Sequence, residues 1–283
     1  MDLTNAAGYF KDEGLNVKVT YLSSAILRTA ISGGTVQVAA FGAPSGEILQ
    51  LNKAPVTVIA DPIPTSLFTI VVAPGITKIS DLAGKPVVVS SSASADELYL
   101  DSLLRATNLG LSNIKLVVDQ ESAQVGLFSG GSIDAVIAAP PQNNEAAKAR
   151  PGSTILTPST GGIVLPQSEL VAYTPYLQKN PAVMVKFLTA YLRGEALFKS
   201  NAARTKAVLV QDDPSLKGAA LSETYTSVAN ALSLSPVPSA TAEQGILNTL
   251  KTLGPPYTTT TGEVTAADLI NATYIKQAMT NAK

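Results

Sequence analysis

Residues 87–99 read V-V-V-S-S-S-A-S-A-D-E-L-Y, a stretch that joins an apolar run directly to a helix start. Three consecutive valines are typical of a short buried strand. Residues 94–97, S-A-D-E, fit a capping box, in which Ser94 and Glu97 satisfy free backbone N–H groups at the start of a helix. The capping box gives no role to the serines at 90–92. We therefore interpret at least one of these serines as a ligand contact.

The same alternation of strand and helix runs along most of the chain and indicates an α/β protein with mainly parallel strands. Strands are predicted at residues 17–22, 36–41, 56–60, 67–73, 87–89, 114–118 and 133–139. The final third is predicted to be mostly helical, with helices from residue 181 and at 222–232, 242–253 and 266–279.

The size and charge of the chain limit its organisation and its partners. With 283 residues it exceeds the size at which one core usually stops growing, so more than one lobe is expected. The net charge is -1 and the basic residues are scattered, which argues against nucleic acid or an anionic membrane as a partner. No apolar run reaches the roughly 20 residues of a membrane span. The first residues show no secretion signal, so the chain is either cytosolic or lacks a removed targeting segment.

The chain contains neither cysteine nor histidine. Their absence excludes thiol catalysis, a Ser-His-Asp triad and metal sites built from imidazole or thiolate. Catalysis through carboxylates, lysine or tyrosine stays open. We expect no cofactor and no metal, and we identify no catalytic residue.

Four predicted strands end in small or polar residues just before a helix, at residues 22–24, 41–45, 89–96 and 139–142. Ligands of open parallel sheets bind outside the carboxyl ends of the strands, where helix starts expose unpaired N–H groups. The alternative for each end alone is an ordinary helix cap or turn. The predicted ligand-binding residues are Ser23, Phe41, Gly42, Ala43, Ser45, Asp61, Ser91, Ser92, Ser94, Ala95, Pro140 and Gln142.

The charge at these strand ends indicates a class of ligand. A helix start favours an anion, and a sulfonate or nitrate reader usually adds an arginine or lysine. The predicted strand ends carry neither residue, and Arg28 lies a full turn inside its helix. We therefore favour a neutral or partly cationic polar organic molecule over a bare anion.

Five segments together resemble a known family. They are A-A-G-Y-F-K-D-E-G-L-N-V-K-V at 6–19, I-S-D-L-A-G-K-P-V-V-V at 79–89, F-S-G-G-S-I-D-A-V-I-A-A-P-P at 128–141, L-P-Q-S-E-L-V-A-Y at 165–173 and K-N-P-A-V-M-V-K-F-L at 179–188. In this order they resemble the nitrate/sulfonate/taurine-type solute-binding proteins of ABC importers, which are similar to thiamine-pyrimidine-precursor-binding proteins. The resemblance implies the two-lobed type II periplasmic-binding-protein fold. Lobe one would hold residues 1–73 and 167–283, lobe two residues 74–166, and the lobes would close about a two-crossing hinge.

The resemblance also implies a function. It implies an extracytoplasmic subunit, expected to be a monomer, that captures a small molecule of sulfonate, pyrimidine or aromatic type and delivers it to a membrane ABC permease. Two alternatives share the fold: an enzyme of thiamine-pyrimidine synthesis, whose relatives use histidine and iron, and a ligand-sensing domain of a transcription regulator. Members of the family have a strand about a dozen residues before G-Y-F, and only residues 1–7 precede it here. If that strand is absent, lobe one has lost a central strand that would form one wall of the site.

Overall fold

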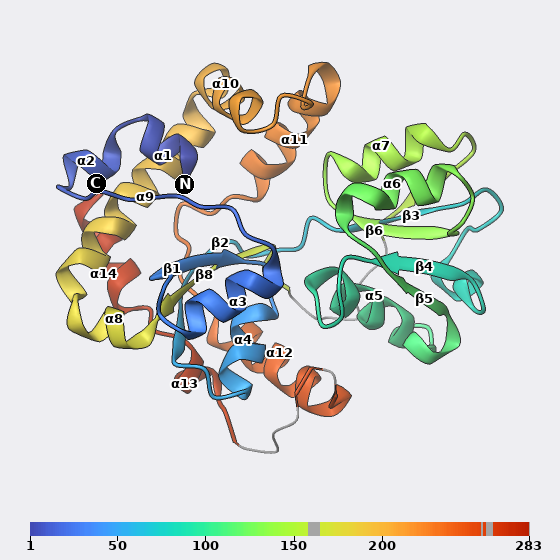
Figure 1. Cartoon of the computed structure of the whole chain (residues 1–283), viewed down its shortest axis with the longest axis horizontal. Coiled ribbons are helices and arrows are strands. Elements are labelled where there is room, and N and C mark those ends of the chain that lie inside the picture. Colours follow the sequence, from blue (N-terminus) through green and yellow to red (C-terminus); the bar gives the residue numbers. More distant parts are fainter. Residues whose placement is uncertain (158–164, 256, 259–262, 283) are drawn as a thin grey trace.

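The computed structural model describes residues 1–157, 165–255, 257–258 and 263–282, and it contains two sheets in two lobes (Figure 1). The sheet of lobe one has the order β1-β8-β2, with bounds Val38–Phe41, Ser168–Tyr173 and Val56–Ile63. The sheet of lobe two has the order β5-β4-β6-β3-β7, with bounds Lys115–Val118, Pro86–Val89, Ala135–Ala138, Thr69–Val72 and Thr154–Leu156. The predicted two-lobed α/β fold is confirmed.

Each sheet contains one strand that runs against the others. In lobe one, β8 is antiparallel to both β1 and β2. In lobe two, β4 is parallel to β5 and β6, whereas β3 is antiparallel to β6 and β7. The reversed strands are the two that the chain enters directly from the other lobe. Both sheets therefore contain antiparallel pairs. A strand that the chain enters from the other lobe runs in the opposite direction to the strands that follow a covering helix.

The chain passes from lobe one to lobe two earlier than predicted. The expected division kept residues 1–73 in lobe one, but β3 lies inside the five-stranded sheet between β6 and β7. The crossing therefore lies between Ile63, the end of β2, and Thr69, the start of β3. A short apolar run identifies a buried strand, but it carries no information about which sheet the strand joins.

Short helices surround both sheets, and the final third covers lobe one, which also holds both chain ends (Figure 1). Before β8 the α-helices are α1 Asp2–Ala6, α2 Tyr9–Asp12, α3 Ser24–Ser32, α4 Ser45–Leu51, α5 Ala95–Arg105, α6 Glu121–Ser129 and α7 Gln142–Ala149. After β8 they are α8 Thr174–Lys179, α9 Pro181–Ser200, α10 Ala202–Asp212, α11 Gly218–Ala231, α12 Ala240–Leu253, α13 Ala266–Leu269 and α14 Thr273–Asn281. The helix predicted over 266–279 is two helices, because Ile270 leaves the helix to bridge Val58 of β2.

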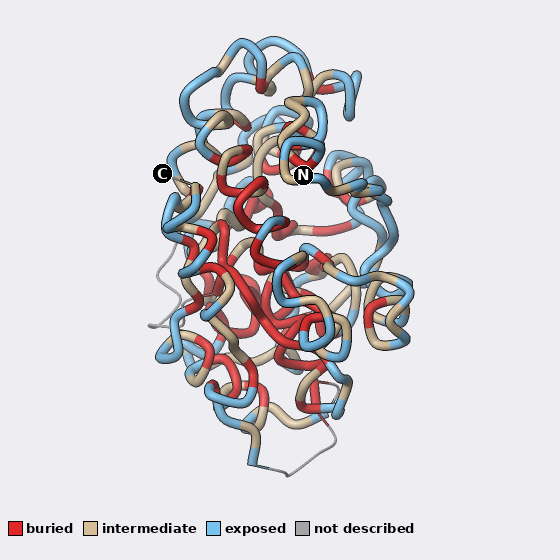
Figure 2. The backbone as a smooth tube through the Cα atoms, turned by 90° about the vertical axis from the view of Figure 1, so that its left-hand side faces the viewer, coloured by how far each residue is buried: buried red, intermediate tan, exposed pale blue. Residues whose placement is uncertain are grey.

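Helix α9 is the main support of lobe one. It starts at Pro181, where the missing N–H is harmless, and buries Met184 and Leu188. Its Phe187 stacks on Phe10 of α2 with ring centroids 5.3 Å apart. Buried residues form a continuous interior under an exposed outer layer (Figure 2). Within the described ranges, the helices are all too short or too polar to cross a bilayer.

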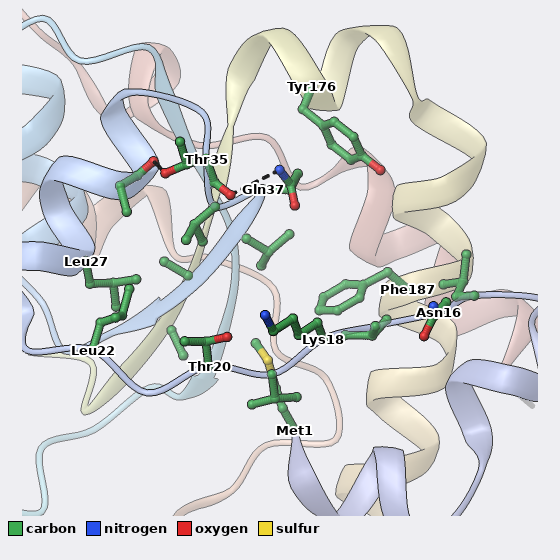
Figure 3. A pocket seen from close by; sticks show the side chains of 18 of the residues that line it. Met1, Asn16, Lys18, Thr20, Leu22, Leu27, Thr35, Gln37, Tyr176 and Phe187 are labelled. Atoms are coloured by element: carbon green, nitrogen blue, oxygen red, sulfur yellow. Dashed lines mark hydrogen bonds between the residues drawn. The ribbon is translucent and has the colours of Figure 1, made fainter.

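The strand predicted at residues 17–22 does not form. Exposure still alternates there, with Val17 and Val19 half-buried and Lys18 and Thr20 exposed, but the segment pairs with no described strand. A cavity of about 900 Å³ separates it from β1 (Figure 3). The segment therefore keeps the period of a strand and lacks the ladder partner that would make it one.

Candidate functional site

A second cavity, of about 750 Å³, lies between the two lobes. Lobe one contributes residues 22–25, the entry to α3. Lobe two contributes the end of β4 and the starts of α6 and α7. The lining residues are Leu22, Ser23, Ser24, Ala25, Ser90, Ser91, Gln120, Glu121, Ser122, Val125, Gln142 and Glu145. The cavity thus lies at a helix start of lobe one and at a strand end and two helix starts of lobe two, where a ligand can touch both lobes.

Three helices begin at this cavity: α3, α6 and α7. Their N-cap residues are Ser23, Gln120 and Pro141, and none of the three makes a side-chain capping bond. In the described part of the chain, the backbone N–H groups of Ser24 and Ala25 have no acceptor. Unpaired N–H groups at a helix start, together with the helix dipole, favour a ligand oxygen or a negative group.

Carboxyl groups in the same cavity oppose a bare anion. Glu121 and Glu145 line it, and the lining set contains no lysine or arginine. Burial, and secondarily the charge of Asp96, raises the pKa of Glu121. A cavity with both helix starts and carboxyl groups suits a ligand that carries acceptors and donors together.

The loop before α5 is held together by its own side chains. Asp96 accepts hydrogen bonds from the Ser90 N–H at 2.6 Å and from the Ser90 hydroxyl at 2.8 Å. Glu97 accepts from the Ala93 N–H at 3.1 Å, and the Ser94 hydroxyl donates to the carbonyl of Ser91. The predicted capping box is therefore wrong, because Glu97 bonds the residue before the N-cap and Ser94 makes no capping bond.

Of the twelve predicted ligand-binding residues, Ser23, Ser91 and Gln142 line the inter-lobe cavity. Their role in binding stays a prediction. The predicted spare hydroxyl of Ser90 also lines the cavity, although it is already bonded to Asp96. The structure places the remaining nine outside the lining. They are Phe41, Gly42, Ala43, Ser45, Asp61, Ser92, Ser94, Ala95 and Pro140.

The turn at residues 41–45 forms a contact between the lobes instead of a free surface. Phe41, Ala43 and Ser45 are buried, and the Ala43 N–H donates to the carbonyl of Pro166 at 3.1 Å. A Cβ added at Gly42 would lie 3.3 Å from the Cβ of Ala95 in lobe two. Gly42 and Ala95 therefore lie close to each other across the lobes, and their role in ligand binding stays a prediction.

The prediction that the first amides of α4 are free for a ligand is also wrong. The Gly46 N–H donates to Oε1 of Glu169 at 2.7 Å. Glu169 lies on β8, which returns from lobe two more than a hundred residues later, so nothing near residue 46 in the sequence indicates this partner.

Asp61, Ser92 and Pro140 have other surroundings than predicted. Asp61 lies inside β2, not in a turn after it, and is buried, and burial raises the pKa of its carboxyl to about 6. Ser92 is exposed and lies outside the cavity. Pro140 lies two residues before α7 and outside the lining.

Several cavity residues that the sequence analysis missed also lie where a strand end is followed by a helix start. Gln120, Glu121 and Ser122 lie between the end of β5 and the first turn of α6. A strand was predicted at 114–118 within the general alternation of strands and helices, so applying the strand-end rule to this fifth junction would have found them. Glu145 lies one turn inside α7, where no rule about helix starts would select it.

One set of carboxyl groups in the described residues lies close enough to share a metal ion. It consists of Glu47, Glu169 and Glu243, which are buried inside lobe one and do not line the inter-lobe cavity.

Solved structures share this architecture. The periplasmic aliphatic sulphonate binding protein SsuA from Escherichia coli has a TM-score of 0.74 and 19% identity, over 98% of this chain and 87% of SsuA. The periplasmic nitrate-binding protein NrtA from Synechocystis PCC 6803 has a TM-score of 0.74 and 9% identity, over 100% of this chain and 85% of NrtA. The desulfurization enzyme DszB is similar at a TM-score of 0.64 and 13% identity, over 100% of this chain and 96% of DszB. These likenesses show the two-lobed periplasmic-binding-protein fold.

No curated protein sequence matches the chain. A family match covers residues 3–203, which is most of the chain, and includes all five segments on which the expected resemblance rests. The match begins at Leu3 and extends through α9 to the start of α10. The chain therefore belongs to the NMT1/THI5-like family.

Proposed function

We propose that this protein is the solute-binding subunit of an ABC importer and captures a small polar organic molecule between its lobes. The observation that carries the proposal is the cavity of about 750 Å³ lined by the starts of α3, α6 and α7 from both lobes. Its size lies within the range of small-molecule sites. Relatives with the same fold are named as periplasmic binding proteins for aliphatic sulphonates and nitrate.

The cavity supports a ligand with two chemically different ends. A carbonyl, ring-nitrogen or sulfonate acceptor would bind the free N–H groups of Ser24 and Ala25. An amine or amide donor would bind Glu121 and Glu145. Sulfonates with an amino group and aminopyrimidines meet both requirements, whereas nitrate offers only acceptors.

Binding would bring the lobes together. A ligand that touches Ser24 in lobe one and Gln142 in lobe two has more contacts in a closed arrangement than in an open one. Differential affinity of this kind shifts the population toward the closed state. The closed surface would be recognised by a membrane permease outside the cytoplasm, and the protein would act as a monomer that performs no chemistry on the solute.

The first experiment is native mass spectrometry of the purified protein, which would reveal a small molecule that co-purifies. The second is a thermal-shift screen with taurine, alkanesulfonates, aminopyrimidines and nitrate. A true ligand at a hundredfold excess over its Kd stabilises the folded state by about 2.7 kcal/mol. Solution scattering with the best ligand should show a smaller radius of gyration. Stabilisation by nitrate alone would contradict the proposed ligand class, and an unchanged envelope at saturation would contradict closure.

A further inference from the structure

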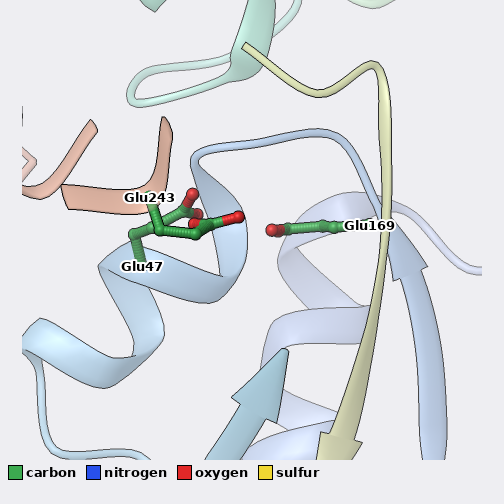
Figure 4. Close-up of side chains that lie close together, drawn as sticks. All are labelled: Glu47, Glu169 and Glu243. Carbon is green, nitrogen blue, oxygen red and sulfur yellow. The ribbon is translucent and has the colours of Figure 1, made fainter. Parts of the chain in front are cut away.

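Three glutamates from distant parts of the sequence meet inside lobe one. Glu47 lies in the first turn of α4, Glu169 on β8 and Glu243 in the first turn of α12. Their side chains point toward one another (Figure 4). One carboxylate oxygen from each lies within 4.8 Å of the other two, and all three residues are 0% exposed.

These carboxyl groups have few partners. Oε1 of Glu169 accepts the Gly46 N–H, whereas Oε2 of Glu169 and the oxygens of Glu47 and Glu243 are buried and receive no well-formed hydrogen bond from an N–H or hydroxyl group. Glu47 and Glu243 lie close enough for one carboxyl, when protonated, to hydrogen-bond the other. None of the three takes part in an ion pair in the described part of the chain. Buried carboxylates without a partner are strongly destabilising, so something must neutralise them.

A fourth buried acid adds to the imbalance. Asp61 of β2 is 2% exposed, and its Oδ1 has no partner either. Its charge helps to raise the pKa of Glu47, Glu169 and Glu243, behind the larger effects of burial and of the glutamates on one another. The charged groups that act on these three carboxyl groups are one another and Asp61, and all of them are acidic.

We propose that Glu47, Glu169 and Glu243 bind one hard divalent cation, with Ca²⁺ preferred to Mg²⁺. Hard cations take carboxylate oxygens, and Ca²⁺ accepts six to eight of them at about 2.3–2.6 Å. An ion midway between two oxygens at the 4.8 Å limit would lie within this range of both. Mg²⁺ demands a shorter and more regular shell, which three glutamates on unrelated elements provide less easily. The absence of histidine and cysteine fits a hard ion better than zinc.

The position of the site indicates what the ion does. Glu47 follows the turn at residues 41–45, whose Gly42 contacts Ala95 of lobe two. Glu169 is the second residue of β8, the strand that returns from lobe two. An ion here would fasten α4, β8 and α12 together at the edge where lobe one meets the hinge. It would stabilise the folded chain whether or not a solute occupies the inter-lobe cavity.

The test uses the whole chain, stripped with EGTA and EDTA and then given CaCl₂ or MgCl₂ alone. Native mass spectrometry should show one calcium ion per chain. At a hundredfold excess over Kd, calcium should raise the melting temperature by roughly 5–10 °C. Glu47→Gln and Glu243→Gln should lose both effects.

The matched control is Glu195→Gln. Glu195 is also buried, but it lies on α9 beside Tyr191 and outside the cluster, so this variant should keep the full calcium response. The proposal would be overturned if native mass spectrometry showed no bound ion and neither calcium nor magnesium changed the melting temperature. The three carboxyl groups would then be neutralised by protons that they share. The mass of the unmodified chain decides this even if a variant fails to fold.

Discussion

Helices α4 and α5 begin in the same way, and their first turns use acidic residues in opposite ways. Each follows a short strand and carries a buried glutamate in its first turn, Glu47 in α4 and Glu97 in α5. Around α5, Asp96 and Glu97 accept hydrogen bonds from their own loop, and Asp101 pairs with Arg105 at 2.9 Å. Around α4, Glu47 faces two further glutamates.

The comparison shows that an acidic residue at a helix start can have two different roles. In lobe two the acids are structural, because they satisfy the loop that connects β4 to α5. In lobe one the acid is left over, because the Gly46 N–H is taken by Glu169 and the side-chain partner of Glu47 is another carboxyl, Glu243. A capping role can be judged from a few neighbouring residues, whereas a shared site becomes visible only when β8 and α12 are in place.

The largest expected effect is the loss of the structural acid in lobe two. Asp96→Ala removes a carboxylate that holds both the N–H and the hydroxyl of Ser90, and it leaves the Ser90 N–H without this acceptor. Hydrogen bonds to charged groups contribute about 1.5–3 kcal/mol each, so the free energy of unfolding should fall by about 3 kcal/mol. Urea unfolding measures it.

Asp81→Ala is the control for this prediction. Asp81 accepts hydrogen bonds from Thr77 and from the Lys78 N–H, but at the start of the 3-10 turn Ile79–Leu82, where these bonds are exposed. Its removal should cost under 1 kcal/mol, since water replaces the lost acceptor. Equal losses at Asp96 and Asp81 would show that burial of the α5 loop contributes nothing.

The next effect is a dependence on pH that belongs to lobe one. Burial, with the charge of Glu47, raises the pKa of Glu243 from 4.5 to about 11. The folded chain then holds a proton that the unfolded chain releases, so in chelator the stability falls as pH rises between these values. The slope is up to about 1.4 kcal/mol per pH unit for each such group.

The cleanest window for this measurement is about pH 9–10. Burial raises the pKa of Asp61 to about 6 and that of Glu195 to about 8, so both have largely titrated below this window. Glu243→Gln should reduce the slope of the melting temperature across this window, since Glu47 and Glu169 still hold raised pKa values, and calcium should flatten it in the unmodified chain. If the melting temperature still fell with pH to the same extent after both changes, the pH dependence would not come from the glutamate cluster of lobe one.

A smaller effect is expected where the two lobes touch. Gly42→Ala places a Cβ 3.3 Å from the Cβ of Ala95 and from the carbonyl oxygen of Gln167. If closure needs this contact, solute affinity should fall about tenfold, which corresponds to about 1.4 kcal/mol, while stability changes little. Gly245→Ala in α12 is the control, since its added Cβ would meet nothing within 4 Å. Calorimetry with the ligand from the screen measures the affinity of both variants. Equal affinities would show that closure does not depend on the contact between Gly42 and Ala95.

The sequence predicted the elements well where periodicity and caps are local. The strand at β4, the helix from Pro181 and the helix starts after β1, β5 and β6 are where the residues indicate them. It failed where the outcome depends on distant partners. Residues 17–22 have a strand pattern and no ladder partner, and β3 joins a sheet that no short run of apolar residues can identify.

The candidate site shows the same division. Strand ends followed by helix starts indicated Ser23, Ser91 and Gln142 at the cavity. The same rule also selected Ser45 and Asp61, which are buried in lobe one. Helix α12 packs against α4, which begins at Ser45. Strand β8 packs beside β2, and the N–H of Asp61 in β2 donates to the carbonyl of Pro236. Sequence alone could not show that a hydroxyl at a strand end is covered by a segment from the final third of the chain.

The smallest effect concerns two neighbouring serines in the loop of lobe two. Ser91 lines the inter-lobe cavity and Ser92 is exposed outside it, although the sequence gives them the same role. Ser91→Ala should weaken solute binding by about 1 kcal/mol, roughly fivefold, if its hydroxyl bonds the ligand. Ser92→Ala is the matched control and should leave the Kd unchanged, and neither should move the melting temperature of the solute-free protein by more than about 1–2 °C. Equal losses at both positions would mean that the loop adjusts its backbone around the solute, and the rigidity that Asp96 and Glu97 give to lobe two would then hold only in the empty protein.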